Sequence, residues 1–304
     1  MNGSRDVPQP IPYQGSKRQL APVILPYFPH KVHRLVEPFA GSAAMSIAAS
    51  SRGMAGSFWL NDAHAPLMAL WQEIVARPHT LATDYATLWN EQLGQERTYF
   101  DKVRDRFNKT AAPVDFLYLL ARCVKAAIRY NAEGRFNNTP DNRRKGARPD
   151  EMRQRLMRAS ALFQGKSRLT DWDYKKVLAN CTNQDFVYMD PPYQGVCGQR
   201  DQRYLPKFAH DEFCHELHKL NKRGIQFIVS YDGRTGEKTF GELLPDTLGL
   251  IHLEVQAGRS TQSTLLGRSD VTYESLYLSS GLTKSARLHG QQRNRQLSLI
   301  CVEN

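Results

Sequence analysis

The stretch RLVEPFAGSAAMSIAAS, residues 34 to 50, indicates the fold class of the chain. Its first six residues are apolar enough for a central strand, and Gly41 then leads into a run of small residues that favour a helix. Residues 57 to 62, SFWLND, are typical of a second strand, and the following APLMALWQEIV has apolar residues three and four apart, as in a helix. Strand, tight turn, helix and strand in this order predict a parallel βαβ unit.

A second informative stretch is DFVYMDPPYQG, residues 185 to 195. Four apolar residues predict a buried strand, and two prolines then end it, because proline lacks an N–H donor and fixes its own φ. The stiff loop would hold the Asp190 carboxylate and the Pro191 carbonyl as fixed acceptors, while Tyr193 adds a flat aromatic face. The stretch is therefore suited to receive an amino group on a planar ring. An ordinary strand-ending turn is the alternative.

The predicted sheet is interrupted along the chain. From about residue 72 to 165 we find only amphipathic helical patterns and one polar stretch rich in Asn, Gly, Pro and Arg. Strand-like runs return with DFVYMD, IQFIVSYDG and TYESLYLSS. We therefore expect an α/β domain over residues 1–71 and 166–283, a mainly helical insertion over 72–165, and a basic C-terminal extension over 284–304.

Composition favours a folded protein with a polyanionic partner. The chain has 304 residues, 41% of them hydrophobic, and 41 Lys and Arg against 30 Asp and Glu, which gives a net charge of +11. We find no run that could span a bilayer and no signal-peptide pattern, so we expect a cytoplasmic location. The five cysteines form no CxxC pair, which argues against a disulfide framework and a cysteine-based zinc site.

Three stretches besides the proline loop carry candidate chemistry. PYQGSKRQL, residues 12 to 20, places Lys17 ahead of a probable helix, where an anion could bind, although a simple helix cap is equally compatible. EPFAGSA, residues 37 to 43, turns sharply, so that a ligand can approach the backbone at Gly41. Asp62 ends the next strand about twenty residues on, where nucleotide-binding folds hold ribose hydroxyls. Many such glycine turns bind nothing, but Asp62 strengthens the interpretation.

In order, the motifs YxGxK, EPFxGxA, a strand-end ND, RYNxxGxFN and DPPY resemble those of the Dam-type adenine-N6 DNA methyltransferases. The resemblance runs from about Pro12 to Ser280. It implies transfer of a methyl group from S-adenosyl-L-methionine to the exocyclic amine of adenine in double-stranded DNA. It also implies a doubly wound S-adenosylmethionine methyltransferase sheet with an inserted, mainly helical target-recognition domain.

The resemblance also assigns roles to residues. The expected catalytic residues are Asp190, Pro191, Pro192 and Tyr193. The expected cofactor-binding residues are Tyr13, Lys17, Glu37, Phe39, Gly41, Asp62, Asp171, Trp172 and Asp190. In the polar stretch, basic residues are interleaved with Asn131, Asn137, Asn138 and Phe136, which suits a hairpin that reads a DNA groove. The expected DNA-binding residues are Arg129, Asn131, Arg135, Asn137, Arg143 and Lys145. A plain solvated loop is the alternative.

The chain departs from the family pattern at two cofactor motifs and in the recognition segment. Ala43 stands where a second glycine is common, and Ser16 stands between Gly15 and Lys17 where another glycine is common. We expect a slightly reshaped turn that stays open to a ligand. Residues 125 to 128 lack the Asn-Gly pattern of the best-known members, so the sequence does not predict the recognised DNA site.

The chemistry of adenine dictates the expected mechanism. Its amine is a poor nucleophile and is paired within a duplex, so the base must leave the helix before it can react. Fixed acceptors at Asp190 and Pro191 would then stabilise the positive charge that develops on nitrogen, without a strong base or a metal. The segment HDEFCHELH puts His210, Cys214 and His218 on one helical face, but we expect a plain helix surface there.

Two other functions stay open from sequence. A cytosine-N4 methyltransferase uses a related loop, usually with Ser in place of Asp190, and a non-catalytic DNA-binding relative could keep the fold. Intact DPPY, Gly41 and Asp62 argue against the second. We expect a monomer or weak dimer that associates with the nucleoid through DNA, in a restriction-modification, phage or regulatory setting.

Overall fold

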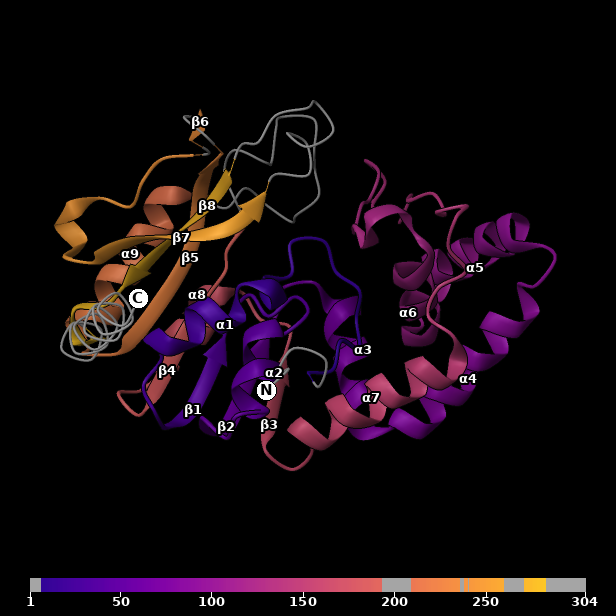
Figure 1. Cartoon of the computed structure of the whole chain (residues 1–304), viewed down its shortest axis with the longest axis horizontal. Coiled ribbons are helices and arrows are strands. Elements are labelled where there is room, and N and C mark those ends of the chain that lie inside the picture. Colours follow the sequence, from indigo (N-terminus) through magenta and orange to yellow (C-terminus); the bar gives the residue numbers. More distant parts are fainter. Residues whose placement is uncertain (1–6, 193–208, 236–237, 240, 260–270, 283–304) are drawn as a thin grey trace, which may run out of the picture.

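One eight-stranded sheet organises the computed structural model, which describes residues 7–192, 209–235, 238–239, 241–259 and 271–282 (Figure 1). Its strand order is β3-β2-β1-β4-β5-β8-β7, and β6 pairs with β5 off this path. The strands are β1 Val32–Glu37, β2 Ala55–Asn61, β3 Ser167–Thr170, β4 Asp185–Met189, β5 Gln226–Thr235, β6 Lys238–Thr239, β7 Ile251–Arg259 and β8 Val271–Leu278.

The strand order reverses between β1 and β4. Strands β3, β2, β1, β4 and β5 pair in parallel, whereas β8 is antiparallel to both β5 and β7. The chain first builds outward from β1 to β3 and then returns to add β4 beside β1. In doubly wound sheets, ligands bind at the carboxyl ends of the strands at such a reversal. The predicted α/β class is confirmed, and the topology places a candidate site beyond Glu37 and Met189.

The predicted βαβ unit forms β1, helix α2 over Ala44–Ser50, and β2. The first strand ends at Glu37 because Pro38 cannot donate a ladder hydrogen bond. Val36 is opposite Trp59 in the parallel pair, and both side chains are fully buried. The segment after Lys17, where a helix was expected, is a 3₁₀ turn over Lys17–Gln19 followed by the short helix α1, Ala21–Ile24.

Helices cover both faces of the sheet. Phe186 and Tyr188 of β4 pack into a core with helices α1 to α3, whereas Val187 and Met189 pack into a second core with α8 and α9. Because β4 is buried on both faces, its sequence is continuously apolar rather than alternating. The flanking helices are α3 Ala65–Ala76, α8 Tyr174–Ala179 and α9 His210–Lys222.

Between β2 and β3 the described chain consists of helices and loops with two isolated β-bridges, and the helical character agrees with the sequence pattern. Figure 1 shows α4 to α7 gathered beside the β3 end of the sheet. The predicted boundary at residue 71 falls inside α3, whose Trp71 packs edge to face against Phe163 of α7. The division into two domains therefore stays a prediction. The remaining helices are α4 Pro78–Glu91, α5 Glu96–Thr110, α6 Pro113–Arg122 and α7 Pro149–Phe163.

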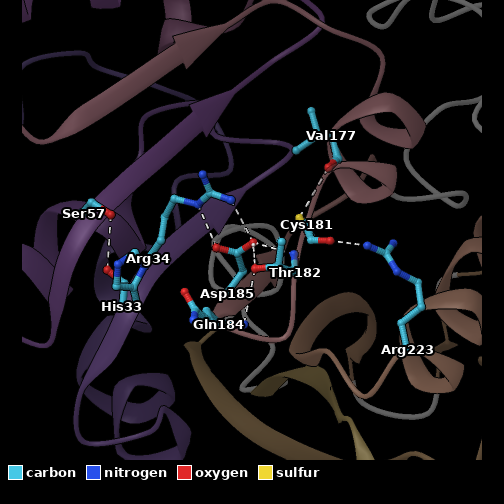
Figure 2. A network of polar contacts seen from close by, with 9 residues as sticks. All are labelled: His33, Arg34, Ser57, Val177, Cys181, Thr182, Gln184, Asp185 and Arg223. Atoms are coloured by element: carbon cyan, nitrogen blue, oxygen red, sulfur yellow. Dashed lines mark hydrogen bonds and ion pairs between the residues drawn. The ribbon is translucent and has the colours of Figure 1, made fainter.

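An ion pair between half-buried Arg34 and buried Asp185 joins β1 to β4 near their amino-terminal ends, as Figure 2 shows. Arg34 donates from Nε and Nη2 to the two oxygens of Asp185, at 2.7 and 2.8 Å. Asp185 also accepts from the backbone and hydroxyl of Thr182. Hydrogen bonding to Asp185 raises the pKa of Arg34 above its usual value despite burial. This network lies at the sheet edge opposite the candidate site.

Candidate functional site

The carboxyl ends of the parallel strands bring three acidic side chains to one edge of the sheet. Glu37 is the last residue of β1, Asp62 follows β2, and Asp190 follows β4. They come from segments up to 153 residues apart in the chain, and only the parallel pairing of these strands aligns them. The sequence motifs therefore meet where the strand order reverses.

The glycine turn after β1 is held from three sides. Gly41 has φ +49°, and a Cβ added there would lie 3.1 Å from Cε1 of Tyr13. Asp62 Oδ2 accepts the Gly41 N–H at 3.0 Å, and Trp71 Nε1 donates to the Gly41 carbonyl at 2.9 Å. Both the positive φ and the close approach of the Tyr13 ring favour glycine at this position.

Ala43, which stands where a second glycine is common, adopts the left-handed conformation, with φ +50° and ψ 35° just before α2. An L residue in this conformation costs about 1 kcal/mol. Its methyl group is fully buried, which offsets part of that cost. The hydroxyls of Ser16 and Ser42 are 2.8 Å apart and tie the N-terminal loop to the turn. The second departure, Ser16, therefore has a structural partner.

Asp62 connects the turn to helix α3. Its second oxygen accepts the His64 N–H at 3.0 Å, and burial raises the pKa of Asp62 although both backbone donors oppose the shift. His64 Nδ1 caps α3 by accepting from Leu67 N–H at 3.1 Å, and its Nε2 lies 2.7 Å from the Tyr130 hydroxyl. Burial lowers the pKa of His64 to about 4, so the ring is neutral at pH 7 and donates to Tyr130.

Glu37 is a buried carboxyl with a raised pKa. It is 3% exposed, and its Oε1 accepts the Ser46 N–H of α2 at 2.6 Å. Burial raises the pKa of Glu37 to about 8, and the nearby Asp190 charge adds to the shift. At pH 7 the carboxyl therefore holds its proton, and a cationic group placed against it would release that proton.

The aromatic residues predicted for the cofactor lie at the same edge. Half-buried Phe39 packs against Tyr174 and Phe213, with ring centroids 5.1 and 6.3 Å away. Trp172 lies just after β3, and the Lys176 ammonium is 3.8 Å from the centroid of its ring. Asp171 is exposed beside it, next to Thr170, whose carbonyl accepts the Asp62 N–H at 3.3 Å.

Lys17 binds carboxylates at this edge. Its Nζ lies 2.8 Å from Asp190 Oδ1 and 3.3 Å from Glu274 Oε1. Burial alone would lower the pKa of Lys17, but these two carboxylates raise it above the ordinary value. Pro191 is buried and Pro192 half-buried, whereas Tyr193 lies outside the described residues.

The strand-end aspartate Asp62 thus holds the glycine turn, and the loop of Asp190, Pro191 and Pro192 lies at the same edge of the sheet. The family model of the D12 class N6 adenine-specific DNA methyltransferases matches residues 13–259. The chain belongs to this family.

Several relatives of the chain are methylases or methyltransferases of low identity. The modification methylase StsI of Streptococcus sanguinis is 24% identical over 245 residues, which cover 76% of this chain and 37% of that enzyme. The type II methyltransferase M1.LlaDCHI of Lactococcus lactis subsp. cremoris is 23% identical over 72% of this chain and 78% of its own length. The retron Ec67 DNA adenine methylase of Escherichia coli is 30% identical over 54% of this chain and 56% of its own. The chain thus spans about a third of StsI and over three quarters of M1.LlaDCHI.

In this D12 family member, residues 129 to 137 form a tight hairpin. Tyr130 and Phe136 form an antiparallel bridge, and Asn137 N–H donates to the Arg129 carbonyl at 3.1 Å. Asn131 shapes the turn by accepting the Arg135 N–H through its side chain at 2.8 Å. Arg129, Arg135 and Asn137 are exposed. The hairpin expected from sequence is therefore present, and its arginines face solvent.

Two residues that the sequence placed among the DNA-reading side chains are anchors of the hairpin. Phe136 is 1% exposed and packs against Phe107 and Phe116, and Asn138 is 6% exposed with its amide donating to the Ala127 carbonyl at 2.9 Å. Burial of this kind leaves neither side chain at the surface for DNA. Their place in the polar sequence is explained by packing beneath the hairpin.

The remaining predicted DNA-binding residues follow the hairpin. Arg143 is exposed, and its backbone N–H donates to Asp141 Oδ1 at 3.0 Å. Lys145 is exposed as well, with its ammonium 2.7 Å from Glu96 Oε1. An exposed ion pair of this type contributes little stability and can exchange for a phosphate contact.

Three positioning residues were absent from the sequence prediction. Fully buried Asn61 donates to the carbonyls of Pro38 and Trp172 and accepts the Trp172 N–H, so it joins the ends of β1, β2 and β3. Asn108 of α5 accepts the Phe136 N–H at 2.7 Å and donates to the Phe136 carbonyl at 3.0 Å. The third is Glu274, whose carboxylate binds the Lys17 ammonium. The strand-end Asn-Asp pair was a usable signal for Asn61, whereas Asn108 and Glu274 meet partners remote in sequence.

Within the described part of the chain, no group of three or more His, Cys, Asp or Glu could hold a metal ion. His210 Nε2 lies 3.5 Å from Cys214 Sγ on α9, and His210 Nδ1 lies 3.3 Å from the Tyr231 hydroxyl. Among the helices of these same residues, none is long and apolar enough to cross a membrane.

Proposed function

We propose that this chain is a site-specific DNA adenine-N6 methyltransferase. The observation that carries the proposal is the Asp190 carboxylate, which directly follows the buried strand β4 at the strand-order reversal, in a chain of the D12 family. Asp190 is 22% exposed, so it is fixed by its surroundings yet reachable by a ligand. The chain's relatives are named as methylases or methyltransferases, one of them a DNA adenine methylase.

The residues around the glycine turn fit S-adenosyl-L-methionine. When bound, this cofactor supplies a methyl group activated by a positively charged sulfur. Glu37 provides a buried acceptor for its ammonium group, Asp62 an acceptor for ribose hydroxyls, and Gly41 an approach to the backbone. Tyr13, Phe39, Asp171 and Trp172 would complete the pocket. Because a carboxylate has about four acceptor positions, Asp62 can hold a ligand while it accepts from Gly41 and His64.

Asp190 and the Pro191 carbonyl would receive the target amine. Two acceptors fixed in advance can take the two N–H groups of a flipped adenine and stabilise the positive charge that develops on its nitrogen. Pro192 stiffens the loop, and Tyr193, assigned from the family motif, would stack on the base. Lys17 holds the Asp190 carboxylate in place through Oδ1.

Double-stranded DNA is the proposed partner, in agreement with the net charge of +11. The hairpin of residues 129 to 137 would read a groove through Arg129, Arg135 and its asparagines, while Arg143 and Lys145 would bind phosphates. We further propose a cytoplasmic enzyme that associates with the nucleoid and acts as a monomer or weak dimer.

The test is the identity of the methylated base. The purified protein would be incubated with labelled S-adenosylmethionine and unmethylated duplex DNA, and the nucleosides separated by liquid chromatography and mass spectrometry. We expect N6-methyladenine, and Asp190→Ala should lower its formation by at least about 100-fold, the scale for losing one fixed polar group at a reacting centre. Asp84→Ala, an exposed carboxylate on α4, is the matched control.

Three outcomes would change the assignment. N4-methylcytosine as product would favour the alternative cytosine methyltransferase, and cofactor and DNA binding without product would favour a non-catalytic relative. Near-normal turnover in Asp190→Ala, with unchanged melting temperature, would remove this loop from the reaction.

A further inference from the structure

Lys17 lies between two carboxylates brought together from distant parts of the chain. Asp190 follows β4, and Glu274 lies on β8, 84 residues later. The side chains of Lys17 and Glu274 are 10% and 9% exposed, and that of Asp190 is 22% exposed. Burying an ion pair of this kind gains little net stability, because desolvation opposes the attraction. Its position beside the proposed catalytic carboxylate suggests a role in the reaction.

Glu274 is held firmly on the sheet. The Ser230 hydroxyl of β5 donates to Glu274 Oε1 at 2.5 Å, and Ser230 is fully buried. Glu274 interrupts an otherwise largely apolar strand, where an ionised side chain is costly unless it is paired. The sequence pattern predicts only a strand for this segment. Because Ser230 holds it, the Glu274 carboxylate is a fixed anchor for the flexible Lys17 side chain.

We propose that Glu274 and Lys17 form a positioning pair that holds Asp190 ionised and oriented toward the target amine. The inference rests on the proposed role of Asp190 in methyl transfer. Lys17 engages Oδ1 of Asp190, and the carboxylate retains capacity to accept a base N–H. Glu274 binds the same ammonium, so that Lys17 keeps its position when a charged ligand enters the site.

The charges around Asp190 explain why the ammonium is needed. Among the described residues, the titratable groups around it include Lys17, Glu37, Tyr188 and Glu274. Three are acids, and burial raises the pKa of Tyr188 further, so its hydroxyl stays neutral. Without the Lys17 ammonium, the carboxyls of Glu37, Asp190 and Glu274 would share one site, and the ionised form of Asp190 would be disfavoured. A protonated Asp190 is a poorer acceptor and offers no charge to the developing cation.

The test is the pH dependence of single-turnover methylation of a DNA duplex by full-length variants. Lys17→Met should move the acid limb of the profile up by about one pH unit or more, the scale for losing an opposite charge within 4–6 Å. In the Lys17→Met/Glu274→Gln double variant the limb should return toward wild type, because one of the crowded negative charges is gone. Glu274→Gln alone should lower kcat with little change in KM for DNA.

Controls separate this inference from other roles of Lys17. Lys17→Arg keeps the charge and should restore the wild-type acid limb, and it serves as the informative variant if Lys17→Met does not fold. Lys219→Met, which removes an exposed lysine paired with the buried Glu216 of α9, should leave the profile unchanged. S-adenosylmethionine affinity, measured by calorimetry, should stay within about twofold of wild type in both Lys17 variants.

The inference is overturned if Lys17→Met leaves the acid limb in place, or if the double variant shows no return. A tenfold loss of cofactor affinity with an unmoved limb would instead make Lys17 a cofactor-binding residue, as the family motif implies. Failure of the proposed function is distinguishable, because the wild-type protein would then form no N6-methyladenine at any pH.

Discussion

At the scale of single residues, Glu37 combines a functional position with a cost to stability. Its carboxyl is buried beyond β1 and has a folded-state pKa of about 8, against an ordinary value of 4.5. Between these two pH values the folded chain keeps the proton that the unfolded chain has released. The free energy of unfolding must therefore fall as pH rises through this window, by up to about 1.36 kcal/mol per pH unit.

Glu37→Gln should remove this loss, because the amide cannot ionise and its oxygen can still accept the Ser46 N–H. We expect the variant to gain roughly 1–3 kcal/mol of stability relative to wild type between pH 5.5 and 7.5. Urea denaturation at both pH values measures the difference, and it isolates Glu37 from His64, whose lowered pKa has the opposite effect below pH 6.5. If the free energy of unfolding changed equally with pH in the two proteins, Glu37 would be ionised in the folded chain.

Residues at strand ends could be predicted, and residues that hold them could not. Gly41, Asp62 and Asp190 each follow an apolar run, so local sequence places them at the carboxyl edge of the sheet. Lys17 was predicted to bind the cofactor, but its partner Glu274 comes from a strand far along the chain. Such pairings depend on sheet order, which no local pattern contains.

At the scale of elements, the hairpin of residues 129 to 137 and the loop after it are proposed to have separate roles, base recognition and phosphate binding. Arg129 is exposed on the hairpin, and a guanidinium there can bind a guanine edge with two hydrogen bonds. Arg143 lies beyond the hairpin on an exposed loop, where a phosphate contact is expected. Lys145 is a less clear probe, because its removal would also release Glu96 from the ion pair.

Arg129→Ala should relax the methylated sequence at one base pair, by roughly 1–3 kcal/mol of discrimination. Arg143→Ala should weaken binding to all DNA alike and reduce the salt slope by about one ion. Single-molecule sequencing of DNA from cells expressing each variant reports the motif, and binding across a salt series reports the slope. If Arg129→Ala lowered methylation evenly with an unchanged motif, the residue would contact only the backbone.

Asn108 supports the hairpin from beneath. Its amide satisfies both the N–H and the carbonyl of Phe136, as a neighbouring strand would. Asn108→Ala would leave two largely buried backbone groups without this partner, at a cost of roughly 1–3 kcal/mol. We expect faster hydrogen exchange over residues 129–137 and weaker DNA binding, with unchanged S-adenosylmethionine affinity.

The matched control is Asn221→Ala, which removes an amide hydrogen bond to the Leu248 carbonyl on the other side of the sheet. It should lower stability without affecting DNA binding. If both variants weakened DNA binding equally, the effect of Asn108 would come from global destabilisation.

Elements differed in how well the sequence predicted them. β4 was predicted because burial on both faces gives a continuous apolar run. β3 was missed, since its four residues SRLT are half-buried or exposed and carry no periodic signal. β7 was missed because its sequence, IHLEVQAGR, interrupts the apolar residues with exposed His252 and Glu254 in an end strand.

At the scale of the whole molecule, the two ends of β4 serve different purposes. Asp185 begins the strand and is paired with Arg34, while Asp190 follows its other end and is paired with Lys17. Asp185 is 2% exposed, in a network at the sheet edge opposite the site (Figure 2). Two carboxylates five residues apart thus belong to opposite edges, because a strand of this length spans the sheet.

This separation predicts that stability and activity respond independently. Arg34→Met would leave the buried Asp185 carboxylate without its ion-pair partner and should lower the free energy of unfolding by about 3 kcal/mol. Below the melting temperature, kcat and S-adenosylmethionine affinity should stay within about twofold of wild type, because the sheet edge that holds Glu37, Asp62 and Asp190 is unchanged. Asp190→Ala should show the reverse, with normal stability and lost methylation. Urea denaturation and single-turnover assays on both variants provide the comparison. A loss of kcat in folded Arg34→Met would instead mean that the ion pair sets the position of the proposed catalytic loop through β4.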